Sequence, residues 1–348
     1  MKTGIIGGRG VGKSTVFRAL TGLAPAPGQS ESRNRARPGQ IKVGDPRLDF
    51  LEAAYGSKKK VPAELTVLDF GPNPKEQKEG AALDASLLPL IRDLDALLIV
   101  VADFAPLRTD LIATVKSIEA ELIFTDFEQA ERRRERINKE KGSSDFEKAA
   151  LEKAIARLEN GAPLRTLEMG AQELTALSQF CFLSQKPAMV VINCETDSVL
   201  DALPAEIEGK LREHGLDAMK LPAVFESELW ELAPEGRQEL LAEAGLKAPA
   251  RDRLIAALYR HLGLISFYTA GEPEAHAWSL RRGATALEAA GRIHSDIAKG
   301  FIRAEVVSYS DFERLKSDAK VKEAGKLRLE GRDYAMQDGD IIHVRFKT

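Results

Sequence analysis

The sequence is poor in aromatic residues and carries almost no net charge. Aromatic side chains make up 6% of the 348 residues, and the formal net charge is −3. With so small a charge, no overall field favours nucleic acid or a membrane as a partner, so any such binding has to use local patches. We therefore expect neither a membrane nor a DNA partner.

Cysteine is also scarce, and long hydrophobic runs are missing. Cys181 and Cys194 lie in apolar sequence without metal-ligand spacing, which favours two ordinary thiols in a reducing compartment. No stretch approaches the roughly 18 apolar residues that cross a bilayer. The first apolar run follows Met1 closely and leaves no room for a signal peptide. These features predict a cytoplasmic protein.

The most specific motif that is present reads GGRGVGKS, from Gly7 to Ser14. It fits the phosphate-binding loop G-x-x-x-x-G-K-[ST], follows the apolar pair Ile5-Ile6 and precedes the helix-compatible stretch from Thr15 to Leu20. Glycines let successive backbone N–H groups turn inward around a polyphosphate, and the following helix adds the positive end of its dipole. The alternative is a glycine-rich turn between a strand and a helix.

This loop predicts a nucleoside triphosphate or diphosphate as the ligand. Lys13 is expected to reach the β and γ phosphates, and the Ser14 hydroxyl to bind a Mg²⁺ ion that bridges them. The residues expected to contact the nucleotide here are Gly7, Gly8, Arg9, Gly10, Val11, Gly12, Lys13, Ser14 and Thr15.

Apolar runs and helical spacing predict an α/β fold with a parallel-rich sheet. Buried strands are expected at Ile5-Ile6, Leu65 to Leu68, Leu97 to Val101, Met189 to Ile192 and Leu221 to Phe225. Between the third and fourth runs lie only helical signals, broken at Gly142-Ser143-Ser144, which predicts an inserted helical hairpin. Its charged tip, EQAERRRERINKEK, is typical of a solvated coiled-coil surface, with a docking site as the alternative.

A separate strand-rich region follows. Short strands are expected at Ala275 to Leu280, Phe301 to Val307, Lys326 to Leu329 and Ile341 to Phe346, with a helix near Ala286 to His294. This pattern predicts a small β-grasp domain. The expected boundaries are 1–107 for the first part of the nucleotide-binding domain, 108–180 for the hairpin, 181–263 for the second part and linker, and 264–348 for the β-grasp domain.

With these parts in order, the chain resembles the YchF branch of the Obg family of P-loop NTPases over essentially its whole length. The strings that carry the resemblance are DPRLD (45–49), IRDLDA (91–96), LENGAPLRTL (158–167), KPAMVVIN (186–193), FYTAG (267–271), AAGRIHSDIAKGFIRAEV (289–306), KEAGKLRLEGRDY (322–334) and DGDIIHVRF (338–346). The resemblance implies a P-loop G-domain with a helical-hairpin insert, a C-terminal TGS-type β-grasp, hydrolysis that usually favours ATP over GTP, and association with the ribosome or ribosomal RNA.

The second G-domain motif of such proteins, D-x-x-G, is altered. Here it reads Asp69-Phe70-Gly71-Pro72, so the aspartate fits a role beside Ser14 at Mg²⁺, and Lys13 and Asp69 are the expected catalytic residues. Proline stands in place of the glycine and has no N–H to give the γ-phosphate. A lost hydrogen bond to a charged group costs about 1 to 3 kcal/mol, or roughly 5- to 150-fold in the discrimination between triphosphate and diphosphate.

The first switch differs as well. The segment from Gly28 to Gln40 contains no threonine for Mg²⁺, so Ser30 or Ser32 would have to substitute. Its arginines, at positions 33, 35 and 37, predict a basic mobile loop that contacts phosphates or RNA, with a solvated loop as the alternative. Asn73 stands where ordinary GTPases place a water-orienting glutamine.

Base recognition is the third departure. Asn193 is kept at the start of the N-K-x-D motif, but Thr196 occupies the acidic position. Guanine donors would then lack a partner, which disfavours strong GTP preference unless Glu195 or Asp197 moves into the slot. The run Ala223, Val224 and Phe225 matches the last base-contacting loop, with an ordinary strand end as the alternative.

These observations predict a slow ATPase, with GTP less favoured, that acts as a ribosome-associated switch. Two alternatives stay open: a nucleotide-binding scaffold that has lost hydrolysis, and a GTPase of the more general Obg kind. Basic residues of the C-terminal strings are candidates for RNA contact, against the alternative of solvated strand faces: Lys299, Arg303, Lys326 and Arg328.

Overall fold

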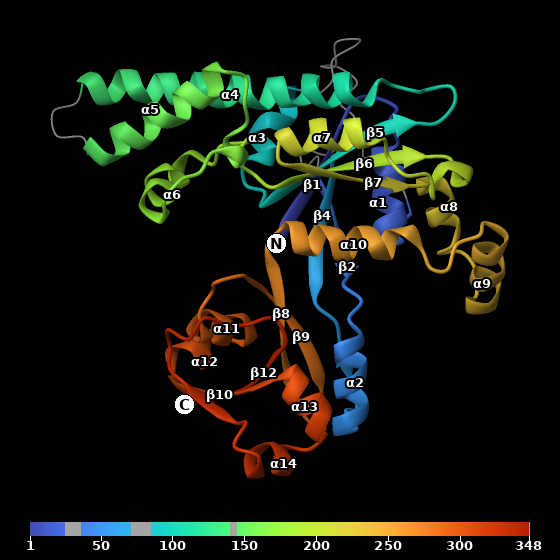
Figure 1. Ribbon diagram of the computed structural model, residues 1–348, viewed down its shortest axis with the longest axis vertical. Coiled ribbons are helices and arrows are strands. Elements are labelled where there is room, and N and C mark those ends of the chain that lie inside the picture. The colour runs from blue at the N-terminus through green and yellow to red at the C-terminus, as the bar shows by residue number, and fades with distance from the viewer. Residues whose placement is uncertain (25–35, 71–84, 140–144, 348) are drawn as a thin grey trace. The chain divides into compact units, whose positions relative to one another are not determined.

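The computed structural model describes residues 1–24, 36–70, 85–139 and 145–347 (Figure 1). The predictions for Ser30, Ser32, Arg33, Arg35, Gly71, Pro72 and Asn73 lie outside these residues. The chain divides into two compact units. Unit 1 contains Met1–Gln40 and Thr66–Leu254, and unit 2 contains Ile41–Leu65 and Ile255–Thr348.

A six-stranded sheet forms the centre of unit 1. In spatial order its strands are β2 (Ala36–Lys42), β4 (Glu64–Phe70), β1 (Lys2–Ile6), β5 (Ala96–Asp103), β6 (Ala188–Cys194) and β7 (Leu216–Leu221). From β4 to β7 each neighbouring pair is parallel. Nearly every side chain of β5 and β6 is buried, which is why these strands read as continuous apolar runs. The predicted parallel-rich sheet is therefore confirmed.

Unit 1 also contains helices. They are α1 (Lys13–Thr21), α3 (Leu88–Ile91), α4 (Leu111–Lys139), α5 (Asp145–Glu159), α6 (Ala171–Leu177), α7 (Ala205–Glu213), α8 (Ala223–Glu228) and α9 (Pro234–Glu243). Short 3₁₀ turns lie at Ala85–Leu87, Leu164–Thr166, Ser178–Phe180 and Thr196–Ser198. On one face, alternate β5 residues such as Ile99 pack against Val115 and Ile118 of α4 and Leu211 of α7. Helix α1 contacts β1 and α8.

Helices α4 and α5 pack along each other and form the predicted hairpin (Figure 1). Its core contains Ala130 and Ile137 from α4 and Leu151 and Ile155 from α5. Charged residues of the two helices form ion pairs with one another. Arg133 of α4, for example, lies 2.9 Å from Glu147 of α5. Both side chains of this pair are half-buried, so solvent screens it less than an exposed pair.

A second six-stranded sheet forms unit 2. Its order is β11 (Arg328–Glu330), β10 (Phe301–Ser308), β12 (Asp340–Phe346), β8 (Leu264–Ala270), β9 (Ala275–Arg281) and β3 (Lys60–Val61). The helices are α2 (Pro46–Tyr55), α11 (Ala286–Ile293), α12 (Ser295–Lys299), α13 (Tyr309–Leu315) and α14 (Asp318–Glu323), and α10 (Ala250–His261) begins in unit 1 and ends here.

The two central strands of this sheet, β12 and β8, are parallel, whereas β8 and β9 are antiparallel. Small side chains let α11 lie close to the sheet, because Ala286, Ala289 and Ala290 are fully buried there. A Thr285–Glu288 capping box begins the helix. This is the arrangement expected of the predicted β-grasp.

The structure assigns residues 41–65 to a different unit than the sequence-based boundaries do. Those boundaries place the segment in the nucleotide-binding domain. The residues belong to unit 2, where β3 adds an edge strand to β9 and α2 packs on β8 and β9. Arg47 on α2 binds Asp338 at 2.8 Å, a partner 291 residues further along the chain. Long-range contacts of this kind leave no periodic signal in the local sequence.

Two predicted strands also need correction. The strand expected at Leu221 to Phe225 ends at Leu221, and Ala223 begins helix α8 instead. A short apolar run does not distinguish a buried strand from a buried helix by periodicity alone. The strand expected from Lys326 begins two residues later, at Arg328.

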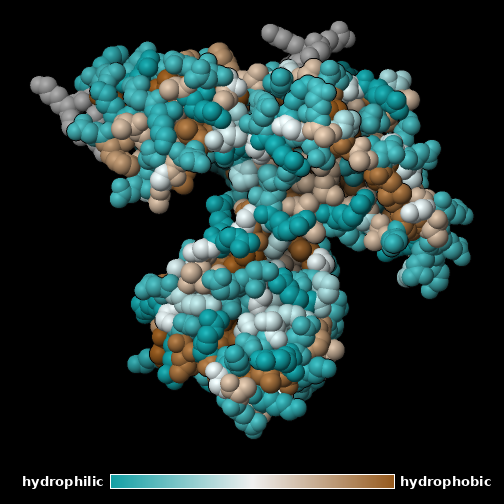
Figure 2. Space-filling model, in the orientation of Figure 1, coloured by the Kyte–Doolittle hydropathy of each residue, from teal (hydrophilic) through white to brown (hydrophobic). Residues whose placement is uncertain are grey.

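None of the helices in the described residues combines the length and the apolar character needed to cross a bilayer. On the face of the molecule that Figure 2 shows, hydrophobic residues reach the surface in small groups between hydrophilic ones.

Candidate nucleotide-binding site

The loop from Gly7 to Ser14 connects β1 to α1, as the motif requires. Gly7 and Gly12 adopt positive φ angles of 145° and 89°. A Cβ atom at Gly7 would lie 2.4 Å from the carbonyl oxygen of Val100, and one at Gly12 would lie 2.2 Å from Asn193 Nδ2. Both glycines are therefore needed for conformation and for space.

Lys13 folds back over this loop. Its Nζ atom donates to the carbonyl oxygens of Gly7 and Gly8, at 2.9 and 2.5 Å. The ammonium group is thus held at the loop by the two residues that open it. Transfer of Lys13 to phosphate oxygens exchanges these neutral acceptors for charged ones, which make stronger hydrogen bonds.

Asp69 lies beside the loop, because β4 pairs with β1 in a register that places Asp69 opposite Ile5. Its carboxylate is 6% exposed and accepts a hydrogen bond from the Ser14 hydroxyl. Burial raises the pKa of Asp69, against the opposing effects of that hydrogen bond and of the Lys13 and Arg37 charges. Lys13, Ser14 and Asp69 therefore gather in one place.

These oxygens fit a magnesium ion. Oδ1 of Asp69 is buried and has no hydrogen-bond partner among the described residues, so one hard oxygen ligand is available beside the Ser14 hydroxyl. Mg²⁺ is typically held by one or two protein oxygens, with phosphate oxygens and water completing its shell. Within the described ranges, no group of three or more His, Cys, Asp or Glu residues forms a metal site made of protein alone.

The sequence predicted Arg37 in a mobile loop, and the structure shows a different location. It lies on β2 rather than in a loop, and its guanidinium covers the ring of Phe17 at 5.1 Å from the centroid. From there its charge opposes the rise in the pKa of Asp69. The pattern of arginines at positions 33, 35 and 37 signalled basic character, but not that this residue belongs to a strand.

A cavity with a volume typical of small-molecule sites opens next to the phosphate loop. It measures about 700 Å³. The loop supplies Gly10, Gly12 and Thr15, and the base-recognition segments supply the other predicted residues Asn193, Val224 and Phe225. Phe104 and Ala105, which follow β5, line it as well and were not predicted. A nucleoside fits this volume.

Asn193 joins the phosphate loop to the segment that is predicted to contact the base. Its Nδ2 donates to the carbonyl oxygen of Val11 at 3.0 Å, and its Oδ1 accepts from the Ala223 amide at 3.3 Å. The side chain is buried, with 4% exposure. Ala223 therefore contacts Asn193, whereas Val224 lines the cavity and is 62% exposed.

Thr196 occupies the acidic position of a guanine site, and a carboxylate lies on each side of it in sequence. Thr196 is half-buried in a 3₁₀ turn and lines the cavity. Glu195 accepts a hydrogen bond from the Ala105 amide at 3.2 Å, so its side chain is directed to the segment after β5. Asp197 is exposed and also lines the cavity.

The basic candidates in unit 2 are mostly paired with carboxylates. Lys299 binds Asp296 at 3.2 Å, and Lys326 lies 3.9 Å from Asp311. Arg328 binds Asp340 at 3.2 Å, while Arg303 is exposed on β10. These local pairs weaken the case for a dedicated phosphate-binding surface built from the four residues.

A parallel sheet with a glycine-rich phosphate loop between its first strand and first helix defines the P-loop NTPase class. Comparisons with known proteins are more specific. The family model YchF-GTPase_C, described as "Protein of unknown function (DUF933)", matches residues 264–347. A protein of Haemophilus ducreyi named "Ribosome-binding ATPase YchF" is 36% identical over 360 residues, which cover 100% of this chain and 99% of that protein.

A Bacillus subtilis protein of the same name is 36% identical over 369 residues, with all of both chains covered. Among solved structures, one described as "Structure of the Schizosaccharomyces pombe YchF GTPase" matches with a TM-score of 0.85 and 30% identity, over 99% of this chain and 97% of that one. The chain belongs to the YchF family.

Proposed function

We propose that the chain is a Mg²⁺-dependent ATPase whose nucleotide state controls its association with the ribosome in the cytoplasm. The observation that carries the proposal is the gathering of Lys13, Ser14 and Asp69 at the mouth of the phosphate loop, next to a cavity of about 700 Å³. The printed names of the bacterial relatives support ATP and the ribosome as its partners.

In this proposal the backbone amides from Gly8 to Ser14 bind the phosphate chain. Lys13 leaves the carbonyl oxygens of Gly7 and Gly8 and binds the β and γ phosphates. Ser14 and Asp69 hold Mg²⁺, which supplies charge neutralisation across the phosphate oxygens when bound. Phosphoryl transfer depends mostly on positioning and electrostatics, so these residues suffice for a modest rate.

Adenine fits the base cavity better than guanine does. Guanine presents two donors that require an acidic acceptor, whereas the hydroxyl of Thr196 both donates and accepts. Adenine offers one donor and one acceptor on the corresponding edge. Asn193 supports the site by holding the Val11 and Ala223 backbones in place.

Calorimetric titration with non-hydrolysable ATP and GTP analogues in the presence of Mg²⁺ tests the nucleotide. We expect ATP to bind at least tenfold more tightly than GTP, and Lys13→Ala to abolish triphosphate binding. GTP binding without detectable ATP binding would overturn the adenine preference. Asp197→Ala then identifies the cause, because loss of GTP binding in that variant would support an Obg-type GTPase.

A scaffold without hydrolysis is the second candidate, and Pro72 favours it because proline cannot donate to the γ-phosphate. Phosphate release by the wild type, compared with that of Lys13→Ala, separates the two. Release above the background of the variant supports the ATPase, and equal release supports the scaffold. Cosedimentation with ribosomes in ATP analogue and in ADP tests the switch: equal binding in both states contradicts it.

A further inference from the structure

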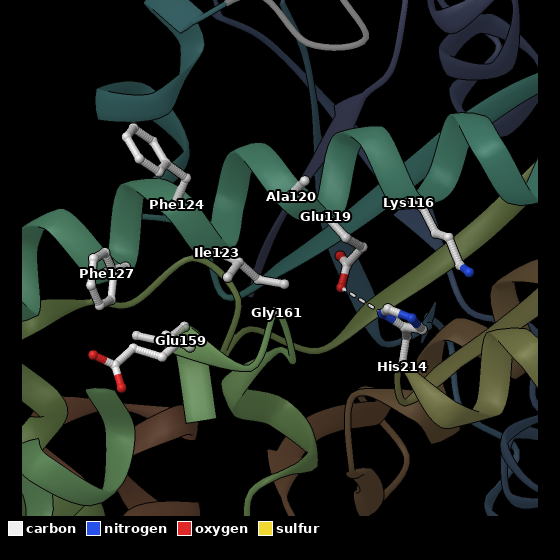
Figure 3. Close-up of a pocket in the computed structure, with 10 residues that line it drawn as sticks. Lys116, Glu119, Ala120, Ile123, Phe124, Phe127, Glu159, Gly161 and His214 are labelled. Atoms are coloured by element: carbon white, nitrogen blue, oxygen red, sulfur yellow. Dashed lines mark ion pairs between the residues drawn. The ribbon is translucent and has the colours of Figure 1, made fainter. Parts of the chain in front are cut away.

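A second cavity of about 610 Å³ lies in unit 1, away from the phosphate loop. Figure 3 shows it between α4, the end of α5 and His214, which follows α7. Its apolar wall comes from Ile123 and Phe127 of α4 and Leu158 of α5. This volume is typical of small-molecule sites and far exceeds the roughly 30 Å³ of one water molecule.

The polar floor of this cavity contains an unsatisfied carboxylate. Oε2 of Glu119 accepts from Arg165 Nη1 at 2.6 Å, in an ion pair with 1% and 5% of the two side chains exposed. The other oxygen, Oε1, is buried and has no hydrogen-bond partner in the part of the chain that the structure describes. A buried charged acceptor without a donor is costly, so the site favours a ligand that supplies one.

His214 stands next to this carboxylate. Figure 3 shows Glu119 directed from α4 toward the imidazole, whose Nδ1 lies 3.9 Å from Oε2 and has no hydrogen-bond partner among the described residues. The His214 side chain is 22% exposed. The imidazole and the carboxylate therefore line the cavity side by side.

The rim of the cavity does not favour a charged ligand. Lys116 and Glu159 are both exposed there and carry opposite charges. The wall, in contrast, offers aromatic surface, because Phe127 is half-buried and Phe124 is 62% exposed. Aromatic rings pack on one another more favourably than their buried area alone predicts.

We propose that this cavity binds a neutral aromatic ring that carries an N–H or O–H donor, with the donor bound to Glu119 Oε1. An indole or a phenol has this chemistry, either as a free small molecule or as a tryptophan or tyrosine side chain of a peptide. The proposal does not depend on the function of the phosphate loop.

Titration of the full ¹⁵N-labelled chain with indole and with 1-methylindole tests it by NMR. The two rings are nearly equal in shape, but only indole has an N–H donor. We expect saturable shifts of α4 and α5 amides with indole, and binding at least about tenfold weaker with 1-methylindole. Equal affinities, or no saturation at millimolar indole, would overturn the proposal.

A variant that fills the cavity locates the site. Ala120 is exposed on α4 and lines the cavity, so Ala120→Trp should remove indole binding without disturbing the core. Ala113→Trp is the matched control, because Ala113 is exposed on the same helix outside the cavity. Indole binding that survives Ala120→Trp contradicts the assignment.

A capped Gly-Trp-Gly peptide distinguishes the two sources of the ring. Binding tighter than that of free indole, and lost in Ala120→Trp, identifies a peptide side chain as the natural occupant. Weaker binding of the peptide identifies a free aromatic molecule. Neither arm depends on added nucleotide.

Discussion

The side-chain amide of Asn193 donates to the backbone carbonyl of Val11 at 3.0 Å, across 182 residues of sequence. This bond and the one from the Ala223 amide connect the phosphate loop, through one buried side chain, to the cavity in which we propose that the base binds. Asn193→Ala leaves two buried backbone groups without their partner. We expect the free energy of unfolding to fall by about 1–3 kcal/mol and ATP to bind more than tenfold more weakly.

Urea denaturation and calorimetry measure these two effects. Asn160→Ala is the control, since Asn160 is exposed and bonds only within its own helix turn, to Ala156. The control should leave both quantities nearly unchanged. Wild-type nucleotide affinity in Asn193→Ala would show that the tie is dispensable.

Gly12→Ala should prevent nucleotide binding. The added Cβ meets Asn193 Nδ2 at 2.2 Å, and the φ of 89° is unfavourable for alanine. Gly245→Ala separates these causes, because Gly245 has a similar φ of 67° but open space around its Cβ position. We expect a loss of about 1–2 kcal/mol from the backbone in the control, and more in Gly12→Ala. Thermal unfolding and ATP titration compare the two variants.

Asp69 should make the nucleotide-free protein less stable as pH rises. Burial raises its pKa above the usual 3.8. Between the unfolded and folded pKa values the folded state binds more protons, so the free energy of unfolding falls as pH increases through this window. Asp69→Asn does not titrate and should lack this component.

The difference in unfolding free energy between wild type and Asp69→Asn, measured from about pH 3.5 to 7, isolates the effect. We expect the wild type to lose stability relative to the variant until pH exceeds the folded pKa, and the difference to stay constant above it. A difference that does not vary with pH would contradict the raised pKa. Saturating Mg²⁺ and ATP should reduce this loss of unfolding free energy at high pH, because the ion neutralises the Asp69 carboxylate.

The buried pair of Glu119 and Arg165 should be much more sensitive than exposed pairs. Arg165→Ala leaves the Glu119 charge without its partner, and we expect a loss of about 3–5 kcal/mol of unfolding free energy. The exposed pair of Arg212 and Glu208, at 3.1 Å, supplies the comparison, and Arg212→Ala should cost less than about 1 kcal/mol. If urea denaturation gave similar losses of unfolding free energy for Arg165→Ala and Arg212→Ala, the buried pair would not be more sensitive than the exposed one.

Arg47 should stabilise unit 2 in a pH-dependent way. Burial opposes ionisation of Asp45, but hydrogen bonds from Arg47 and Tyr268 outweigh it and lower the pKa of Asp45. The stabilisation is therefore present above the unfolded value near 3.8 and is lost as pH falls through the lower folded value. Arg47→Ala should lower the melting temperature at pH 7 and reduce this loss in acid. An unchanged melting temperature at pH 7 contradicts the prediction.

The phosphate loop and the parallel strands were predictable because their signals are local. The spacing of Gly7 to Ser14 fixes the loop, and burial on both faces makes β5 and β6 continuous apolar runs. Residues 41–65 were not predictable, since contacts such as Arg47 to Asp338 assign them to unit 2.

In the candidate site, too, some residues have a local sequence signal and others depend on long-range packing. Lys13 and Ser14 follow from the motif, whereas Arg37 depends on how β2 packs on Phe17. The end of β7 was missed because Ala223, Val224 and Phe225 are apolar in either a strand or a helix. The sequence thus predicted the conformation of the phosphate loop better than that of the segment after β7.

The chain passes from one unit to the other three times, at residues 40–41, 65–66 and 254–255. A gene truncated before residue 264 would therefore keep α2 and β3 but remove β8 and β9, the strands of unit 2 on which they pack. Likewise, a protease cut at any one crossing leaves the two halves covalently joined by the others. Exchange of unit 2 between genes during evolution would thus require two separate gene segments, those for residues 41–65 and 255–348, to be transferred together.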